Sequence, residues 1–139
     1  MSFNLIVFDS GFKFISDAEV ITEVLAVFIG SIYNQGKDLE SAVRLALNEV
    51  EGTFGICVIC SDNPDLVIAA RRGSPLVVGI GDDEFIVASD ASAIIQHTRQ
   101  VIYLSDNEMA VISRNGITTK TIARISINSQ IPRDILINF

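Results

Sequence analysis

The hydrophobic pattern of the sequence changes at Phe54, and this change restricts the fold more than any other feature. From there onward, short apolar runs alternate with turn residues. The runs are FGICVICS, LVIAARR, PLVVGIG and FIVASD, and the segments between them are DNPD, GS and DDE. This pattern predicts four strands in under forty residues, arranged as a meander.

Two helices are predicted before this change. Between Ser16 and Asn34 apolar residues recur at helical spacing, and Ser16-Asp17-Ala18-Glu19 fits a capping box. The recurring apolar residues are Val20, Val24, Val27, Phe28 and Ile32. A second helix is predicted from Asp38 to Val50, with Gly52 as its stop. Because only a short turn joins the two helices, they should pack antiparallel.

The remaining elements follow the fourth predicted strand. They are a helix at 91–98, capped by Asp90 or Ser89, and strands at 100–104, 109–114 and 117–127. Asn115-Gly116 is a two-residue hairpin signal, because both residue types accept a positive φ.

Helices first and an antiparallel sheet after them predict an α+β layer architecture. Ile and Val supply 34 of the 139 residues, a β-branched excess that favours a sheet-rich fold. The runs VIAA and LVVGI are apolar on both faces, which fits a sheet that is covered on both sides. The length and the absence of an internal repeat predict a single domain over residues 1–139.

The charge balance limits the classes of partner. The sequence has 17 acidic and 10 basic side chains, for a formal charge of -7. Nucleic acid and anionic membrane surfaces are disfavoured, because a polyanion gains no counterion release from so acidic a protein. The sequence has no run of 18 apolar residues, and its N-terminus lacks the features of a secretory signal. We therefore expect a cytoplasmic protein that binds neither nucleic acid nor a membrane.

Cys57 and Cys60 form a CxxC, which in other contexts marks a redox site or half of a zinc site. Here they lie in a predicted strand, where residues three apart point to opposite faces. Zinc would also need a second pair of ligands, and His97 is the one histidine. The sequence therefore predicts two buried thiols.

His97 and the pair Arg71-Arg72 are the other side chains considered for a site. His97 ends the predicted helix at 91–98, where a protonated imidazole would interact favourably with the helix dipole. Arg71-Arg72 follows a strand and precedes Gly73, with no glycine-rich loop that opens a helix. We interpret the pair as a solvated strand end.

Several motifs resemble one known family. RRGSPLVVGIG is followed by FIVASDASAII, HTRQVIYL and MAVISRNG, and it is preceded by DAEVI at residues 17–21 and by GKDLESAVRLALNEVEGTFG. In this order they resemble the glutaminase domain of glutamine:fructose-6-phosphate aminotransferase, also called glucosamine-6-phosphate synthase. The resemblance covers about residues 12–116 and identifies the chain as the C-terminal portion of such a domain, whereas the tail at 117–139 diverges.

The resemblance implies an N-terminal-nucleophile fold with four layers, αββα, in a class II glutamine amidotransferase. In that family an N-terminal cysteine attacks the side-chain amide of L-glutamine, and its own α-amino group serves as the base. An Asn-Gly pair donates to the oxyanion, an arginine binds the substrate carboxylate and an aspartate binds the α-amino group. The ammonia passes to an isomerase domain that makes glucosamine 6-phosphate. The resemblance implies no cofactor and no metal.

Only Asp17 matches a site residue of the family, the aspartate that binds the α-amino group of glutamine. An aspartate in the first turn of a helix is also stabilised by the helix dipole, so capping explains it equally well. The chain begins Met1-Ser2-Phe3 where the family has Cys-Gly-Ile-Val-Gly. We therefore assign no catalytic residue and expect the chain alone to be inactive.

The N-terminal stretch offers two weaker links to the family. Phe3 to Phe8, followed by Asp9-Ser10-Gly11, is similar to the family's strand that ends in His-Asn-Gly. A carboxylate at Asp9 would repel a developing oxyanion. Removal of Met1 would expose Ser2 as a nucleophile, but Ser2 lies closer to Asp17 along the chain than the family requires.

Two hypotheses about function remain open. The chain is either part of the glutaminase domain of an aminotransferase of this family, or a non-catalytic module that uses the same sandwich for self-association or partner binding. Unpaired strand edges favour a homodimer or a higher homo-oligomer. The tail, RISINSQIPRDILINF, is apolar enough to supply a swapped or docking strand, and Pro132 would end that strand.

Overall fold

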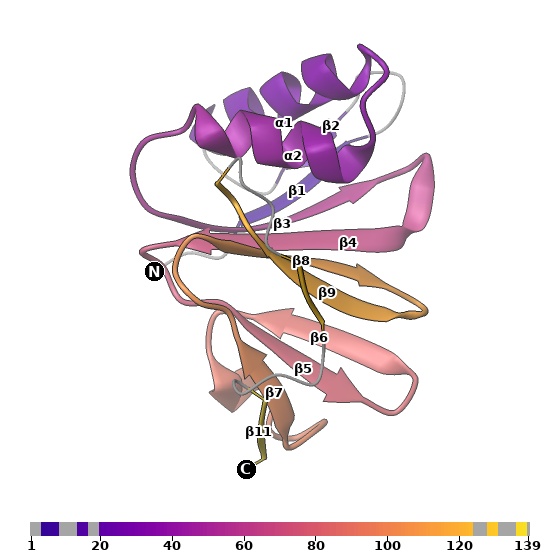
Figure 1. Ribbon diagram of the computed structural model, residues 1–139, viewed down its shortest axis with the longest axis vertical. Coiled ribbons are helices and arrows are strands. Elements are labelled where there is room, and N and C mark those ends of the chain that lie inside the picture. Colours follow the sequence, from indigo (N-terminus) through magenta and orange to yellow (C-terminus); the bar gives the residue numbers. More distant parts are fainter. Residues whose placement is uncertain (1–3, 9–13, 17–19, 124–127, 131–135, 139) are drawn as a thin grey trace.

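A computed structural model describes the backbone of residues 4–8, 14–16, 20–123, 128–130 and 136–138, and the side-chain surroundings of residues 24–123 (Figure 1). The elements in chain order are β1 (Asn4–Phe8), β2 (Phe14–Ser16), α1 (Val20–Tyr33), α2 (Leu39–Asn48), β3 (Phe54–Cys60), β4 (Asn63–Arg72), β5 (Val77–Gly81), β6 (Glu84–Ala88), the 3-10 helix η1 (Ala91–Ala93), β7 (Gln100–Tyr103), β8 (Glu108–Ser113), β9 (Gly116–Thr121), β10 (Asn128–Gln130) and β11 (Leu136–Asn138).

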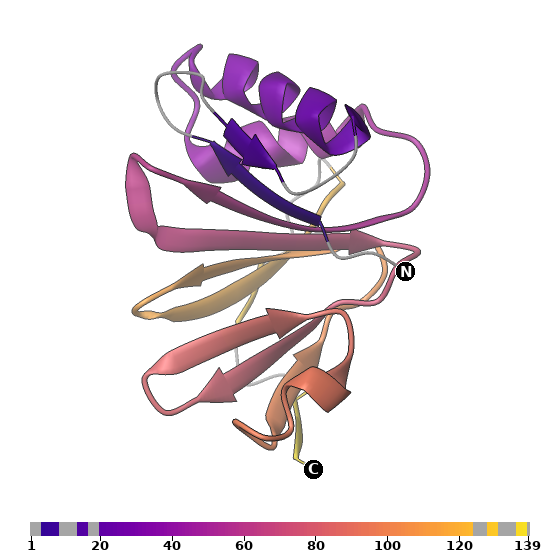
Figure 2. The same ribbon diagram turned by 180° about the vertical axis from the view of Figure 1, so that it is seen from behind.

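The described elements form three layers. The helices α1 and α2 cover one face of a seven-stranded sheet, and a four-stranded sheet packs on its other face (Figures 1 and 2). The strand orders are β10-β9-β8-β4-β3-β1-β2 and β11-β7-β5-β6. The predicted fold class is confirmed, because α1 and α2 are followed by mainly antiparallel sheets; β1 and β2 precede the helices and join the larger sheet. The pairing of β1 with β3 is the one parallel pair among the described strands.

The predicted meander is wrong, because the four strands divide between the two sheets. The hairpin β3–β4 lies at the centre of the seven-stranded sheet, whereas β5–β6 belongs to the four-stranded sheet. The chain crosses between the sheets after Arg72, and β8 then returns to pair with β4. Both sheets bury apolar faces, so hydrophobicity alone does not tell which strands are partners.

The core consists of two main apolar layers. One lies between the helices and the seven-stranded sheet and includes Ile29, Leu47 and Ile68, and the other lies between the sheets and includes Ala69, Val78 and Ile102. Successive residues of β4 such as Ile68 and Ala69 thus face different layers and are both fully buried. This confirms that the sheet is covered on both sides.

Helix α2 agrees with its prediction. Asp38 caps it, because the Asp38 Oδ1 atom accepts a hydrogen bond of 3.1 Å from the Ser41 backbone N–H. Its buried residues share one face and are Leu39, Ala42, Val43, Ala46 and Leu47. The spacing of these residues is that of an amphipathic helix against a sheet.

Helix α1 forms where predicted but buries a different face. Leu25, Ala26 and Ile29 face the core. Val24 and Val27, two of the residues whose spacing predicts the helix, are 62% and 51% exposed. The helix is apolar around its circumference, so the sequence does not specify its inner face. Residues 17–19 of the expected capping box lie outside the described part of the chain.

Two local predictions are also wrong. The helix expected at 91–98 is only the 3-10 helix η1, capped by Asp90, and Ile94 after it packs directly onto Gly79 of β5. The turn between β8 and β9 is displaced by one residue. Ser113 pairs with Gly116, so Arg114 and Asn115 are the two turn residues, and of Asn115 and Gly116 only Gly116 has a positive φ.

The tail docks onto its own chain. The strand β10 pairs antiparallel with β9, and β11 pairs antiparallel with β7, so the tail adds one strand to each sheet. The tail is predicted to supply a swapped or docking strand for another chain, and that role stays a prediction, because the two described tail strands pair within their own chain. Pro132 lies outside the described residues.

Candidate functional site

Asp17, the one site residue predicted from the sequence, lies outside the described residues, in the segment between β2 and α1. Ser2, Asp9 and the end of the stretch similar to His-Asn-Gly also lie outside them. The strand expected before Asp9 is present as β1 and pairs in parallel with β3. A role for Asp17 in binding an α-amino group thus stays a prediction.

The two thiols are buried on opposite faces of β3. Cys60 lies in the core under the helices, whereas Cys57 pairs with Ala69, whose side chain belongs to the layer between the sheets. Burial raises the pKa of the Cys57 thiol to about 12. Both cysteines are free, and neither is more than 6% exposed. The prediction of buried thiols is confirmed, and a Cys57 thiol that stays protonated near neutral pH is a poor nucleophile.

A polar contact at the end of β3 was not foreseen from the sequence. The Tyr33 hydroxyl donates a hydrogen bond of 2.9 Å to Asp62 Oδ2, which joins the end of α1 to the β3–β4 turn. This bond is the main cause that raises the Tyr33 pKa to about 12. Because the hydroxyl stays protonated as a donor, the contact fixes the helix end and offers no base near neutral pH.

Arg71 and Arg72 stabilise the end of the sandwich where the chain crosses between the sheets. Arg72 donates to the Leu47 and Val50 carbonyls at the end of α2, at 3.2 and 2.6 Å. Arg71 Nη1 donates to the Leu104 carbonyl at 2.8 Å, on the other crossing. The interpretation of the pair as a solvated strand end is therefore wrong. Both side chains bind backbone carbonyls, and neither is available to bind phosphate.

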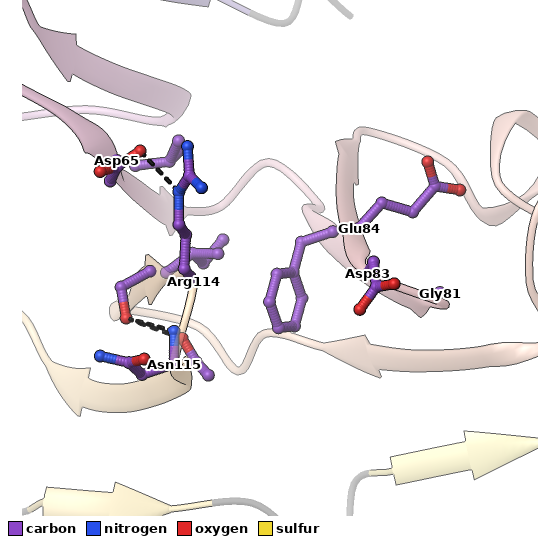
Figure 3. Close-up of a pocket in the computed structure, with 11 residues that line it drawn as sticks. Asp65, Gly81, Asp83, Glu84, Arg114 and Asn115 are labelled. Atoms are coloured by element: carbon purple, nitrogen blue, oxygen red, sulfur yellow. Dashed lines mark hydrogen bonds and ion pairs between the residues drawn. The ribbon is translucent and has the colours of Figure 1, made fainter.

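The opposite end of the sandwich is open. A cleft of about 860 Å³ lies there between the β8–β9 turn and the β5–β6 turn. Figure 3 shows Arg114 and Asp65 on one wall, joined by an ion pair of 2.8 Å, and Asp83 and Glu84 on the other. Apolar side chains between the walls are those of Val67, Phe85 and Ile112.

The described lining of this cleft is charged. Among the described residues that line it, none is a cysteine, histidine or lysine. The Ser113 hydroxyl accepts a hydrogen bond of 3.3 Å from the Asn115 N–H. Asp65 and Arg114 are 49 positions apart and meet only because β4 pairs with β8, so no local pattern predicts the cleft. Its chemistry suits binding rather than covalent catalysis.

Other candidate features do not form a site in the part of the chain that the structure describes. His97 is exposed in a turn after η1, so the interpretation that it ends a helix is wrong. Within the described ranges, no three His, Cys, Asp or Glu side chains are grouped to hold a metal ion. No helix in those ranges is long and apolar enough to cross a bilayer.

No protein-family model matches the sequence. Individual proteins do. The chain is 50% identical over 117 residues to glutamine–fructose-6-phosphate aminotransferase (isomerizing) of Chlorobaculum tepidum. This match covers 83% of the chain and 19% of that enzyme. It is 48% identical over 103 residues to the enzyme of that name from Bacteroides thetaiotaomicron, with 74% and 16% covered. It is 43% identical over 107 residues to the enzyme of the same name from Clostridium tetani, and this match covers 77% of the chain and 17% of that enzyme.

A solved structure shares the fold. The glutamine phosphoribosylpyrophosphate amidotransferase from B. subtilis, solved with ADP and GMP, superposes with a TM-score of 0.60 at 22% sequence identity. The match covers 76% of this chain and 23% of that one. The chain spans less than a fifth of the length of the three aminotransferases it matches. It is therefore homologous to a segment of the glutamine–fructose-6-phosphate aminotransferases and shares the fold of the matched part of the B. subtilis amidotransferase.

Proposed function

We propose that the chain, over about residues 12–116, is the C-terminal portion of a glutamine amidotransferase domain. In the parent family this domain hydrolyses L-glutamine and supplies ammonia for glucosamine 6-phosphate synthesis. The proposal is supported by 50% identity to an aminotransferase named for glutamine and fructose 6-phosphate. In this role the segment provides the helical layer and the central strands that support a glutamine site.

We further propose that the 139-residue polypeptide does not hydrolyse glutamine by itself. The observation that carries this proposal is the position of its two cysteines, which are both buried within β3. An amidotransferase of this class needs a thiolate next to a free amine, and a strand interior offers no free amine. The two reduced, buried thiols also agree with a cytoplasmic location.

The test is glutamate release from L-glutamine by the purified 139-residue chain. We expect no rate above that of buffer. A measurable rate that is lost in Asp17→Ala would contradict the proposed inactivity, because Asp17 is the residue matched to the substrate amine. Binding is tested separately by calorimetry with L-glutamine and L-glutamate on the chain and on Asp17→Asn. Heat that is specific to glutamine and lost in Asp17→Asn would support a retained substrate subsite.

A second candidate function is self-association as a homodimer or higher oligomer. It is favoured by the outer face of α1, where Val24, Val27 and Phe28 are 62%, 51% and 36% exposed. Glu23 is the only charged residue of this 14-residue helix, so the face adds little to the repulsion between two acidic copies. We propose that a second copy of the chain covers it. Light scattering at increasing protein concentration tests this, with a mass above 15.1 kDa expected.

A further inference from the structure

The strand β6 forms one edge of the four-stranded sheet. Its only partner among the described strands is β5, to which it is joined by a two-residue turn. The opposite edge of the same sheet is occupied by β11 from the tail. In Figures 1 and 2, β6 lies on the side of the sandwich where β1 and β2 end the larger sheet, away from β9 and β10.

The register of the hairpin shows which backbone groups of β6 face outward. Gly81 pairs with Glu84 across the turn, so this pair exchanges both hydrogen bonds. Because the pattern alternates, Ile86 and Ala88 also bond to β5, whereas the N–H and C=O groups of Phe85 and Val87 point away from it. No backbone hydrogen bond outside the strand pairs involves these two residues in the described part of the chain. They form a short template for one more strand.

The side chains of β6 do not protect this edge. The strand reads EFIVA, without proline, lysine or a register shift. Phe85 and Val87 lean against the layer between the sheets, and Ile86 and Ala88 against the outer face with Ile94. All four are only half-buried. A strand added here would cover apolar surface on both faces of the sheet.

The charge around the edge selects the partner. Asp82, Asp83 and Glu84 are exposed at the turn before β6, and Asp90 is exposed after it. None of the four takes part in an ion pair among the described residues. In a full-length antiparallel pairing of two copies of β6, Asp82 of one copy would lie opposite Asp90 of the other. Like charges opposed across strands are destabilising, so a second copy fits this edge poorly.

We propose that β6 is a docking edge for an extended polypeptide segment that has alternating apolar side chains and a basic residue at each end. The segment pairs antiparallel with β6 through the backbone of Phe85 and Val87, and its basic ends lie beside Asp82–Glu84 and Asp90. This surface lies on the four-stranded sheet and does not depend on glutamine binding or on the outer face of α1. Its test therefore succeeds or fails independently of the proposed function.

The probe is a capped synthetic peptide, Lys-Thr-Val-Thr-Val-Thr-Lys, titrated into the full 139-residue chain. Amide hydrogen exchange is followed at Phe85 and Val87. In the free protein both amides should exchange fast, and with saturating peptide both should slow by at least about tenfold. The matched control peptide has glutamate in place of both lysines. The control should bind more weakly by about fivefold or more, and the difference should shrink in high salt.

Two variants test the backbone contact. Val87→Pro removes an outward N–H that makes no bond to β5, and it should abolish peptide binding. Val87→Ala loses the same packing but keeps the N–H, and it should bind. If Val87→Pro does not fold, the peptide with N-methyl groups on its three threonines, compared with one methylated on its two valines, gives the same test from the ligand side. One of the two should fail to bind and the other should bind.

Three results would overturn the proposal. The first is that the lysine and glutamate peptides bind equally well, or that neither peptide binds. The second is slow amide exchange at Phe85 and Val87 in the free protein, at any protein concentration. Protection that rises with protein concentration would indicate a second copy of the chain at this edge. The third is unchanged binding by both N-methylated peptides, which would exclude strand addition.

Discussion

Arg72 and Arg114 both lie where a strand ends, yet their surroundings differ. Arg72 donates to two carbonyls at the end of α2 and to Asn107 Oδ1, and its guanidinium lies 4.9 Å from the centre of the Phe54 ring. The Arg114 side chain is 82% exposed and pairs with Asp65. Arg72 therefore joins a helix to the sheet through several bonds, whereas Arg114 makes one exposed ion pair.

Replacing Arg72 should destabilise the fold. Arg72→Met keeps much of the side-chain volume but removes the donor to the Val50 carbonyl and to Asn107 Oδ1, whereas the Leu47 carbonyl keeps the Val50 N–H. The free energy of unfolding should therefore fall by about 2–3 kcal/mol. Arg114→Met is the matched control and should change it by less than about 0.5 kcal/mol. Urea unfolding followed by circular dichroism measures both. Equal effects of the two variants would contradict the role assigned to Arg72.

The residue scale also shows what local sequence cannot supply. Arg71-Arg72 looks like a solvated strand end because its partners, among them Leu47 and Leu104, are far away in the chain. The cysteines could be placed correctly, because opposite faces follow from strand geometry alone. A prediction made from the strand itself thus holds, whereas one that depends on the next layer does not.

At the scale of elements, the cap of α2 gives a pH-dependent prediction. The hydrogen bond from Ser41 lowers the Asp38 pKa below its ordinary value of 3.8. The stabilisation by this carboxylate is therefore present above pH 3.8 and is lost as the pH falls through the lower pKa of the folded state. At neutral pH, Asp38→Ala should cost about 1 kcal/mol.

Asp38→Asn is the matched variant, because an amide oxygen also accepts the Ser41 N–H but does not titrate. Its stability should stay near that of the parent at neutral pH and should fall less steeply in acid. Urea midpoints measured from pH 6 down to pH 2.5 test both variants. If the urea midpoints of the parent and of Asp38→Asn fall equally steeply as the pH is lowered, protonation of Asp38 is not coupled to folding.

Most elements could be predicted because their apolar residues repeat at a helical or strand spacing and turn residues mark their ends. Helix α2 and the strands from β3 to β8 lie within a few residues of their predicted places, whereas β9 ends at Thr121, before the predicted end at 127. The 91–98 helix failed for a tertiary reason. Ile94 must reach Gly79, and a short 3-10 turn presents it to the sheet. The face of α1 failed because apolar residues surround the whole helix, so spacing alone selects no inner side.

At the scale of the whole molecule, the division of strands between sheets could not be predicted. The hairpins β3–β4 and β5–β6 have similar apolar runs, and only the crossing after Arg72 separates them. That crossing is fixed by long-range bonds such as Gly73 N–H to Asp106 Oδ1 at 2.6 Å. The cleft at the open end is a consequence of the same division, since its walls come from different sheets.

The exposed face of α1 gives the prediction that belongs to the whole molecule. If a second copy covers this face, a lysine at its centre should disrupt the dimer, because the charge would lose water on association. Val27 is 51% exposed there, so Val27→Lys should leave the fold intact. In sedimentation at high protein concentration, the parent should be a dimer and Val27→Lys a monomer.

Ile95 supplies the control, because it is 45% exposed in the turn that follows η1 and does not belong to α1. Ile95→Lys adds the same charge and reduces the net acidity equally, so a general electrostatic effect would change both variants alike. It should remain a dimer. A parent protein that is monomeric at every concentration would exclude self-association through α1. A monomeric Ile95→Lys together with a dimeric Val27→Lys would instead place the interface near Ile95.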